Sequence, residues 1–395
     1  MQKPKEEALK QFFQSEKKRF EAHVHYLYFP ATIPNNLSIQ KILPINKDDL
    51  NSCGKKTIQL FDSEEESELS NAFRDLKFKI LAWFEIQDIL EYQFSPTLLD
   101  DDSKSTLDKF LPIFAKPYCY FEASRLLKEG FMAGTNGYFN CSLASLRSFI
   151  ELATIHIYFK KQEEENREGF ESWIREQKGH PPFRTLLDYI FEHEGGINFL
   201  RDRIVSSYDL TSIYAHKPRP SESFTLMRRS TGLLPSLDAL AYWVMATAHV
   251  LRSLLCLYAA NYPMCFFPVD IIKKFGFRGP LGVFFNESNY AVISKGIENE
   301  DIVLLKNTFC VHPDVTARLN WYSALPILTD ADLEKEWMAC VIGYGLSKEV
   351  AAITDNNHRY SALQARTRAQ MALLLYHYVE KIAKEKLENL RALIN

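Results

Sequence analysis

Residues 197–216 carry polar side chains at the spacing of one helix face. Steps of three or four residues bring together an arginine, two hydroxyls and an imidazole: Arg201, Tyr208, Ser212 and His216. These positions share a face because an α-helix turns once in about 3.6 residues. Arginine binds anions and imidazole moves protons, so this face has the composition of a site for a charged ligand. His216 would end the helix, where the negative end of the helix dipole favours its protonated form.

Further charged residues extend this candidate site. Lys217 and Arg219 follow His216 and form a small cationic tip. In an earlier helix, Arg147 and Glu151 are four residues apart, so they share a face and could form an internal ion pair. We expect catalytic roles at one set of residues: His216, Arg203, Ser212 and Tyr208. We expect binding roles at a second set: Arg201, Asp209, Tyr214, Lys217, Arg219, Arg147 and Glu151.

The motifs of common metal and cofactor enzymes do not occur in the sequence. There is no glycine-rich phosphate loop, no His-Glu-x-x-His, no Gly-x-Ser-x-Gly and no dinucleotide fingerprint. His23 and His25 form a His-x-His pair, but no carboxylate or cysteine stands nearby at ligand spacing. We therefore predict neither a metal site nor a cofactor.

The candidate residues must be positioned by helices, and the middle of the chain is its most regular part. Residues 141–161 repeat apolar side chains at core spacing: Leu143, Leu146, Ile150, Ala153 and Ile157. Similar segments recur up to residue 260, and five antiparallel helices of this length form a bundle. We predict a mainly α fold with a central antiparallel helical bundle, a small β-containing C-terminal insertion and a long C-terminal helix.

The regions around the bundle are less regular. An acidic patch at 62–70 is expected to open a helix that runs to about Tyr92, and the runs at 39–45 and 56–61 could pair as strands. The runs at 279–297 and 301–311 read as a hairpin and a third strand. Four regions follow: 1–117, helical with short strands; 118–262, the bundle; 263–328, a β-containing module; and 329–395, C-terminal helices with an apolar stripe that could self-associate.

Composition sets limits on the partners and the compartment. Lys plus Arg is 47 and Asp plus Glu is 50, so the net charge is −3, and no whole-chain attraction to nucleic acid or to anionic membrane exists. The apolar segment 237–260 is interrupted by Asp238, His249 and Arg252, which favours a buried helix over a membrane span. Seven cysteines at irregular spacing indicate free thiols. We predict a cytoplasmic protein without membrane contact.

Four segments of the middle region resemble a known family: EASRLLKEGFMAG, SLASLRSFIELATIHIYF, FRTLLDYIF and SSYDLTSIYAH. They are similar to the helical HEPN-like domains (higher eukaryotes and prokaryotes nucleotide-binding) of bacterial proteins linked to phage defence and toxins. The shared features are an Arg-x-x-x-Glu on one long helix and a Tyr-x-x-x-Ser-x-Tyr-x-His that ends a later one. The resemblance covers roughly residues 118–260.

The resemblance implies an action on RNA. Many members of the family are dimeric ribonucleases, in which Arg-(four to six residues)-His motifs meet across the interface and cleave RNA without a metal. Here the motif is degenerate, because positions 209–211 hold Asp, Leu and Thr where the arginine would precede His216. The resemblance then implies either an endoribonuclease or an RNA- or nucleotide-binding protein. His216 would be its base, and Arg201, Arg203 or Arg219 would supply the cation.

Two alternatives remain open at this point. One is a small-molecule enzyme that uses a carboxylate pair such as Glu151 with Asp209, and the other is a structural role. The polar face of 197–216 could be packing and hydrogen-bonding residues that close the bundle. The protein would then be a non-catalytic scaffold or sensor that binds a protein partner through the β module and the C-terminal helix. Two smaller features could also contact nucleic acid: Arg228 and Arg229 as cations, and the aromatic pairs 284–285 and 321–322 as stacking platforms on the predicted sheet.

Overall fold

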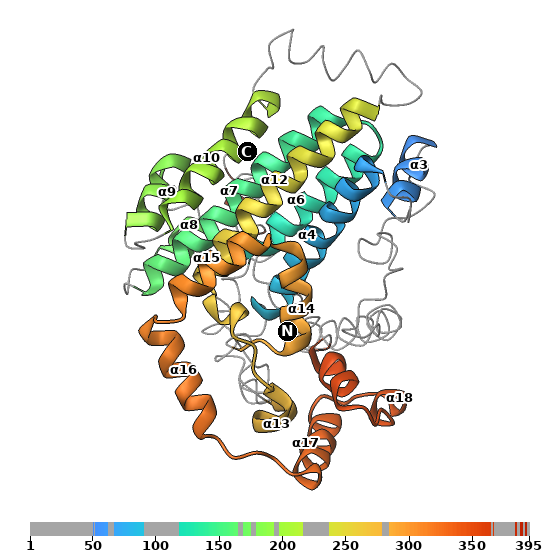
Figure 1. Cartoon of the computed structure of the whole chain (residues 1–395), viewed down its shortest axis with the longest axis vertical. Helices are drawn as coiled ribbons and strands as arrows, with labels where there is room; N and C mark the ends of the chain where they lie inside the picture. Colours follow the sequence, from blue (N-terminus) through green and yellow to red (C-terminus); the bar gives the residue numbers. More distant parts are fainter. Residues whose placement is uncertain are drawn as a thin grey trace.

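The computed structural model is mainly helical (Figure 1). It describes residues 50, 52–61, 67–90, 118–164, 169–174, 179–192, 197–215, 237–278, 284–364, 366, 384, 388, 389 and 392. No β-strand occurs in these ranges. Long helices occupy one end of the described part and shorter helices the other.

The long helices pack side by side, which confirms the helical-bundle character but neither the predicted bounds nor an antiparallel order throughout, since one of these helices precedes residue 118. They are α4 (Glu68–Leu90), α6 (Tyr118–Thr135), α7 (Phe139–Glu164), α10 (Asn198–Ala215) and α12 (Leu237–Asn261). Their apolar faces share one core, in which Trp83, Trp243 and Tyr258 are fully buried. Burial of such large aromatic surfaces is the main term that holds helices together. The expected helix after the acidic patch is α4.

The connection between α6 and α7 depends on two glycines. Gly137 has φ 87°, a left-handed conformation that glycine adopts without steric cost, and its N–H donates to the Gly134 carbonyl at 3.0 Å. A Cβ on Gly134 would lie 2.1 Å from the indole of Trp243. The small residue thus leaves room for the Trp243 ring of α12 against α6. The Trp243 Nε1–H in turn donates to Ser142 Oγ on α7 at 2.7 Å.

The directions of α7, α10 and α12 follow from their contacts. Along α7 and α12 the contacting residue numbers rise together: Ser142 with Trp243, and Ala153 with Tyr258. Along α10 and α12 they run in opposite order: Arg203 with Cys256, Ser207 with Ser253, and Tyr214 with Tyr242. Helix α12 is therefore parallel to α7 and antiparallel to α10. The C-terminal end of α10 consequently lies beside the N-terminal half of α7.

Three short helices flank the bundle: α3 (Ser52–Phe61), α8 (Phe170–Ile174) and α9 (Phe183–Glu192). Helix α3 contradicts the strand predicted at 56–61. Its buried residues Gly54, Thr57 and Ile58 recur at helical spacing, whereas a half-buried strand would alternate. The partner strand predicted at 39–45 lies outside the described residues.

The prediction of a β-containing module at 263–328 is wrong. Its described residues form short helices: η4 (Pro263–Phe266), α13 (Ile271–Phe275), η5 (Gly276–Arg278), α14 (Glu287–Gly296), α15 (Asn299–Phe309) and α16 (Pro313–Ala324). The predicted third strand is α15, whose buried Ile302, Leu305 and Phe309 lie three and four residues apart.

The predicted hairpin loop is the start of a helix. Asn286 N-caps α14: its side chain accepts the Asn289 N–H at 2.8 Å, while Asn289 Oδ1 accepts the Asn286 N–H at 3.1 Å. Reciprocal bonding of this kind satisfies free N–H groups at a helix start. Asparagines three residues apart serve a four-residue turn and a capping box equally well, so the local sequence does not separate the two structures.

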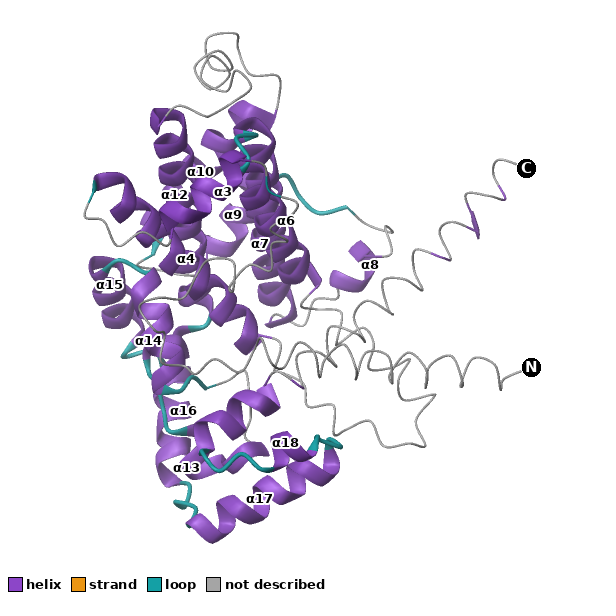
Figure 2. Ribbon diagram, turned by 90° about the vertical axis from the view of Figure 1, so that its right-hand side faces the viewer, coloured by secondary structure: helices purple, strands orange, loops and turns teal. Residues whose placement is uncertain are grey.

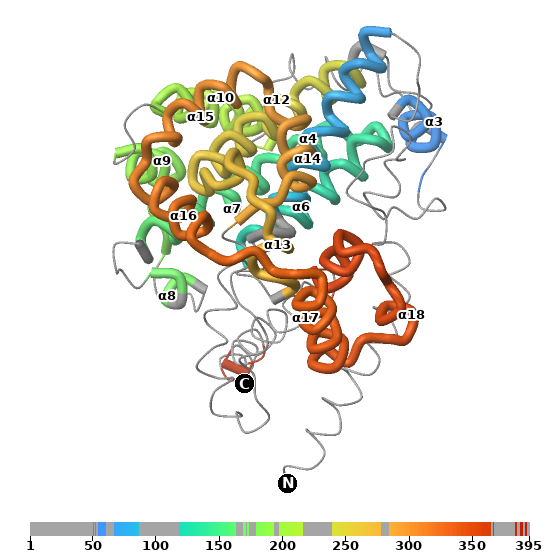
Figure 3. The backbone as a smooth tube through the Cα atoms, turned by 60° about the horizontal axis from the view of Figure 1, so that its bottom comes forward, coloured from blue at the N-terminus to red at the C-terminus, as the bar shows by residue number. Residues whose placement is uncertain are grey.

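The C-terminal helices lie at the lower end of the described chain, beside α13 (Figures 2 and 3), and pack against η5. They are α17 (Asp330–Gly343) and α18 (Lys348–Ala351), followed by a helical stretch at 356–364. Helix α17 starts where the sequence predicts, with Thr329 as its N-cap in a capping box with Asp332. The long C-terminal helix predicted from Ser361 lies mostly outside the described residues, and so does its apolar stripe.

Helix α12 has the length and composition of a membrane span over Ala239–Asn261, but 72% of its most apolar window is buried inside the structure. This burial is that of a core helix and is compatible with a soluble protein. Among the cysteines whose side chains the structure describes, none forms a disulfide, and Cys119, Cys256, Cys265 and Cys340 are buried. Helix α4 packs against α12 and α14. The domain boundaries themselves stay a prediction.

Candidate functional site

Two elements predicted to contribute to the site meet in the structure. The Arg147 guanidinium of α7 donates to Glu151 at 3.1 Å and to the Tyr208 hydroxyl of α10 at 2.8 Å. The Tyr208 hydroxyl donates to Glu151 Oε1 at 3.0 Å, which closes a triangle of three hydrogen bonds. The expected ion pair between Arg147 and Glu151 thus forms, and Tyr208 joins it. We call these three residues with Ser212 the α7–α10 seam.

Packing fixes the Tyr208 ring in this position. Phe183, the first residue of α9, stacks on it with ring centroids 3.9 Å apart and planes 15° from parallel. The Arg147 guanidinium lies 5.1 Å from the ring centroid, at the distance of a cation–π contact. The side chains of Arg147 and Glu151 are 18% and 34% exposed, so the seam reaches solvent on the carboxylate side.

Two polar atoms of the seam are buried without a partner: Arg147 Nε and Ser212 Oγ. Ser212 stands one turn after Tyr208 on the same face of α10. A buried donor that makes no hydrogen bond costs about 1–3 kcal/mol, so such groups call for an explanation, and a binding site is one. Because α10 and α7 are antiparallel, Ser212 lies toward the N-terminal end of α7, beyond Arg147.

The other predicted binding residues of α10 are paired with neighbours. Arg201 donates to Asp188 of α9 at 2.5 and 2.8 Å, and this bond raises the pKa of Arg201. Asp209 accepts from Arg184, also of α9, at 3.2 Å. Tyr214 donates its hydroxyl to Tyr242 of α12 at 3.2 Å. Arg201 and Asp209 therefore attach α9 to α10.

Three predicted site residues lie outside the described ranges: His216, Lys217 and Arg219. Helix α10 ends at Ala215, directly before His216. The roles predicted for these three residues stay predictions, as do Arg228 and Arg229.

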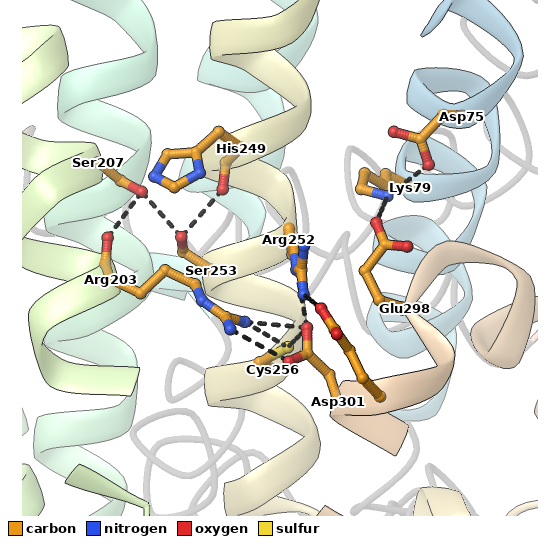
Figure 4. Close-up of polar contacts among 11 residues, drawn as sticks. Asp75, Lys79, Arg203, Ser207, His249, Arg252, Ser253, Cys256, Glu298 and Asp301 are labelled. Atoms are coloured by element: carbon orange, nitrogen blue, oxygen red, sulfur yellow. Dashed lines mark hydrogen bonds and ion pairs between the residues drawn. The ribbon is translucent and has the colours of Figure 1, made fainter. Parts of the chain in front are cut away.

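Arg203, predicted as catalytic, lies on another side of α10 and belongs to a different cluster (Figure 4). It donates to both carboxylate oxygens of Asp301, at 2.9 and 3.1 Å. Arg252 of α12 donates to the same carboxylate at 2.8 Å and to Glu300 at 2.6 Å. The Asp301 side chain is 3% exposed. We call Arg203, Arg252 and Asp301 the Asp301 cluster.

The charges of the Asp301 cluster shift the pKa values within it. Burial acts to raise the pKa of Asp301, but hydrogen bonds from Arg252 and Arg203 outweigh burial and lower it. Burial and then the two arginine charges lower the pKa of His249, which stands one turn before Arg252. Burial raises the pKa of the Cys256 thiol, whose sulfur lies 3.5 Å from Asp301 Oδ2. Cys256 is thus a protonated, unreactive thiol near neutral pH.

A second buried ion pair holds the same end of α15. Lys79 of α4, whose side chain is 3% exposed, donates to Glu298 at 2.9 Å and to Asp75 at 2.5 Å. Glu298 is the N-cap of α15 and Asp301 is in its first turn. Figure 4 shows both acidic residues directed at cations of the bundle. The start of α15 is therefore fixed to α4, α10 and α12 by charge as well as by packing.

Sequence reasoning missed this cluster because its residues are far apart in the chain. One signal was present: His249 and Arg252 interrupt an apolar helix, and a charge within a buried helix requires a partner. Their spacing of three places them on one face. The partner, Asp301, stands 49 residues later, at a separation that spacing rules do not address.

Within the described ranges, no group of three or more His, Cys, Asp or Glu side chains is arranged to hold a metal ion. Comparison with family models, with characterised protein sequences and with solved structures finds no match for this chain.

Proposed function

We propose that this protein is a HEPN-like protein of the bacterial defence or toxin type that binds RNA or a nucleotide at the α7–α10 seam. The observation that carries the proposal is the pair of unbonded donors at the seam, Arg147 Nε and Ser212 Oγ, beside the bonded Arg147, Glu151 and Tyr208. An anionic or carbonyl oxygen of a ligand is the acceptor that either donor lacks.

The seam supplies groups with distinct tasks. Arg147 would hold a phosphate and is kept in place by Glu151 and Tyr208. Ser212 would donate its hydroxyl to the same ligand. If cleavage follows, His216 would take the proton of the ribose 2′-hydroxyl, and the developing charge would fall on the cations of the seam. Arg203 has no part in this account, because Asp301 occupies its guanidinium.

The resemblance adds two expectations. HEPN-like ribonucleases act as dimers, so we propose a homodimer as the active form. We place it in the cytoplasm, where the free thiols of the described cysteines would stay reduced.

The proposal is tested with labelled total RNA, with and without EDTA. Wild-type protein should cleave RNA equally under both conditions, and His216→Ala should not cleave it. The matched control is His180→Ala, because His180 is an exposed histidine that stands five residues after Arg175 and bonds the Pro181 carbonyl. Equal loss in both variants would exclude a specific role for His216. Absence of both cleavage and RNA or nucleotide binding would exclude the proposal.

A second candidate is a scaffold or sensor that binds a protein partner. It is favoured by the charge balance at the α7–α10 seam and at the adjoining contact of α9 with α10, where Arg147, Arg184 and Arg201 are each paired with a carboxylate. Paired cations attract a polyanion weakly. Met338 and Ile342 of α17, 45% and 77% exposed, offer an apolar contact surface. This candidate predicts that Met338→Glu with Ile342→Glu reduces association, measured by sedimentation, and leaves RNA binding unchanged.

A further inference from the structure

Trp321 is a large aromatic side chain that stands in solvent. It belongs to α16 and is 51% exposed, while Trp83, Trp243 and Trp337 are fully buried. An exposed indole leaves a large apolar surface in contact with water, and such a surface is typical of a binding site. Helices α13 and α16 lie close together here, at the lower end of the described chain in Figure 2.

The indole of Trp321 rests on a rigid aromatic base. Its ring lies 5.9 Å from Phe284 at 23° between planes and 5.5 Å from Phe275 at 33°. Phe284 is 2% exposed, so the base is part of the core. The backing rings restrict the rotation of the indole before any ligand binds, and this lowers the entropy cost of stacking. Phe284 was predicted to lie on a sheet and stack a base; in the structure its ring is buried and stacks on Trp321.

Two cations near this ring, Arg318 and Lys274, form no ion pair with a described carboxylate. Arg318 stands one turn before Trp321 on the same helix, is exposed, and forms no ion pair with a described carboxylate. Lys274 lies 4.6 Å from the Tyr322 ring centroid and donates to the Tyr322 and Ser323 carbonyls, each at 2.9 Å. Its charge is thus not neutralised by a carboxylate. This differs from the seam, where carboxylates pair the arginines.

We propose that Trp321, with Arg318 and Lys274, binds single-stranded nucleic acid by stacking a base on the indole. A base has an aromatic face that matches an indole, and the phosphates on either side match the two cations. Asp270, a carboxylate one turn before Lys274, accepts the Lys273 N–H at 3.0 Å, which satisfies part of its charge. The inference does not rest on the α7–α10 seam, because none of its residues belongs to that site.

The test measures binding of fluorescein-labelled oligoadenylate and oligouridylate by anisotropy, using the full chain. We expect Trp321→Ala to weaken binding at least tenfold. Trp321→Phe, which keeps an aromatic ring, should weaken it less than fivefold. Arg318→Gln should weaken binding and reduce its dependence on salt. Tyr138→Ala is the matched control, because Tyr138 is 62% exposed and lies at the α6–α7 turn. It should bind like the wild type.

A second readout reports on the indole itself. Addition of oligoadenylate should quench tryptophan emission, and the quenching should be absent in Trp321→Phe. Binding by Trp321→Ala equal to that of the wild type would overturn the proposal, as would failure of the wild type to bind either oligonucleotide. In the latter case a protein partner becomes the better occupant of this surface. Ser212→Ala in the same titration separates the two sites, because it alters the seam and leaves Trp321 intact.

Discussion

The carboxylate of Asp301 accepts two hydrogen bonds from the guanidinium of Arg203, at 2.9 and 3.1 Å, although the two residues are 98 positions apart in the sequence. This contact joins α15 to α10, the helix that carries the candidate site. Since Arg252 bonds the same carboxylate, the charge of Asp301 is shared among three helices. Arg203 therefore links α10 to α15. This structural role differs from the catalytic role predicted for it.

Asp301→Asn should destabilise the protein by about 3 kcal/mol, because it removes the charge of a buried carboxylate that bonds two arginines, and leaves Arg203 without a carboxylate and Arg252 with Glu300 alone. Urea denaturation followed by circular dichroism measures the change. The control is Glu300→Gln, since Glu300 also bonds Arg252 but is 77% exposed and should cost less than about 1 kcal/mol. Equal effects of the two variants would show that burial of Asp301 contributes nothing.

Stability should fall in acid because of His156. Burial, and then the charge of Lys160, lowers the pKa of His156 to about 3, against 6.5 in the unfolded chain. Between these values only the unfolded state binds the proton, so the free energy of unfolding falls by about 1.4 kcal/mol for each unit of pH below 6.5. His156→Gln should reduce this slope to the part that comes from His249, whose pKa is also lowered, and preserve a partner for Tyr262, now bonded to His156 at 3.2 Å.

The matched control for this pH dependence is His180→Gln, at an exposed histidine. Its unfolding should keep the slope of the wild type between pH 4.5 and 6.5. If His156→Gln and the wild type lose stability in parallel over this range, His156 is not buried in its neutral form.

Two glycines in helices should respond in opposite directions to alanine. Gly134→Ala would place a methyl group 2.1 Å from the Trp243 ring, which is buried and cannot move, and should cost about 3 kcal/mol. Gly343→Ala meets nothing within 4 Å and should stabilise α17 by about 0.5 kcal/mol, since alanine loses less backbone entropy. Thermal unfolding of both variants measures the difference, and a tolerated Gly134→Ala would contradict the close contact of the Trp243 ring with Gly134.

The helices of the middle region could be predicted because their signal is local. Apolar residues at helical spacing in 141–161 determine which face of α7 is buried, and Leu143, Leu146 and Ile150 are buried as predicted. The pair Arg147 and Glu151 was predictable for the same reason. The run at 301–311 was wrongly predicted as a strand. Helix α15 is short, and a short apolar run fits a strand or a helix.

Contacts between distant segments could not be predicted in this way. Nothing in the spacing of α9 indicates that Phe183 stacks on Tyr208, or that Arg184 reaches Asp209. Both contacts depend on the angle at which α9 meets α10, which the packing of the whole bundle determines. The sequence therefore predicts which residues of α10 share a face, but not which of them are already paired.

The most direct test of the central proposal is the single change Ser212→Ala, measured for stability and for binding of labelled RNA and nucleotide. Ser212 Oγ makes no hydrogen bond, so its removal should raise the free energy of unfolding by about 1 kcal/mol. The same change should weaken ligand binding several-fold. The control, Ser207→Ala, loses the 2.8 Å bond to Ser253 on another face of α10, and it should destabilise the protein and leave binding unaltered. A Ser212→Ala protein that binds both ligands as tightly as the wild type would contradict a ligand site at the α7–α10 seam.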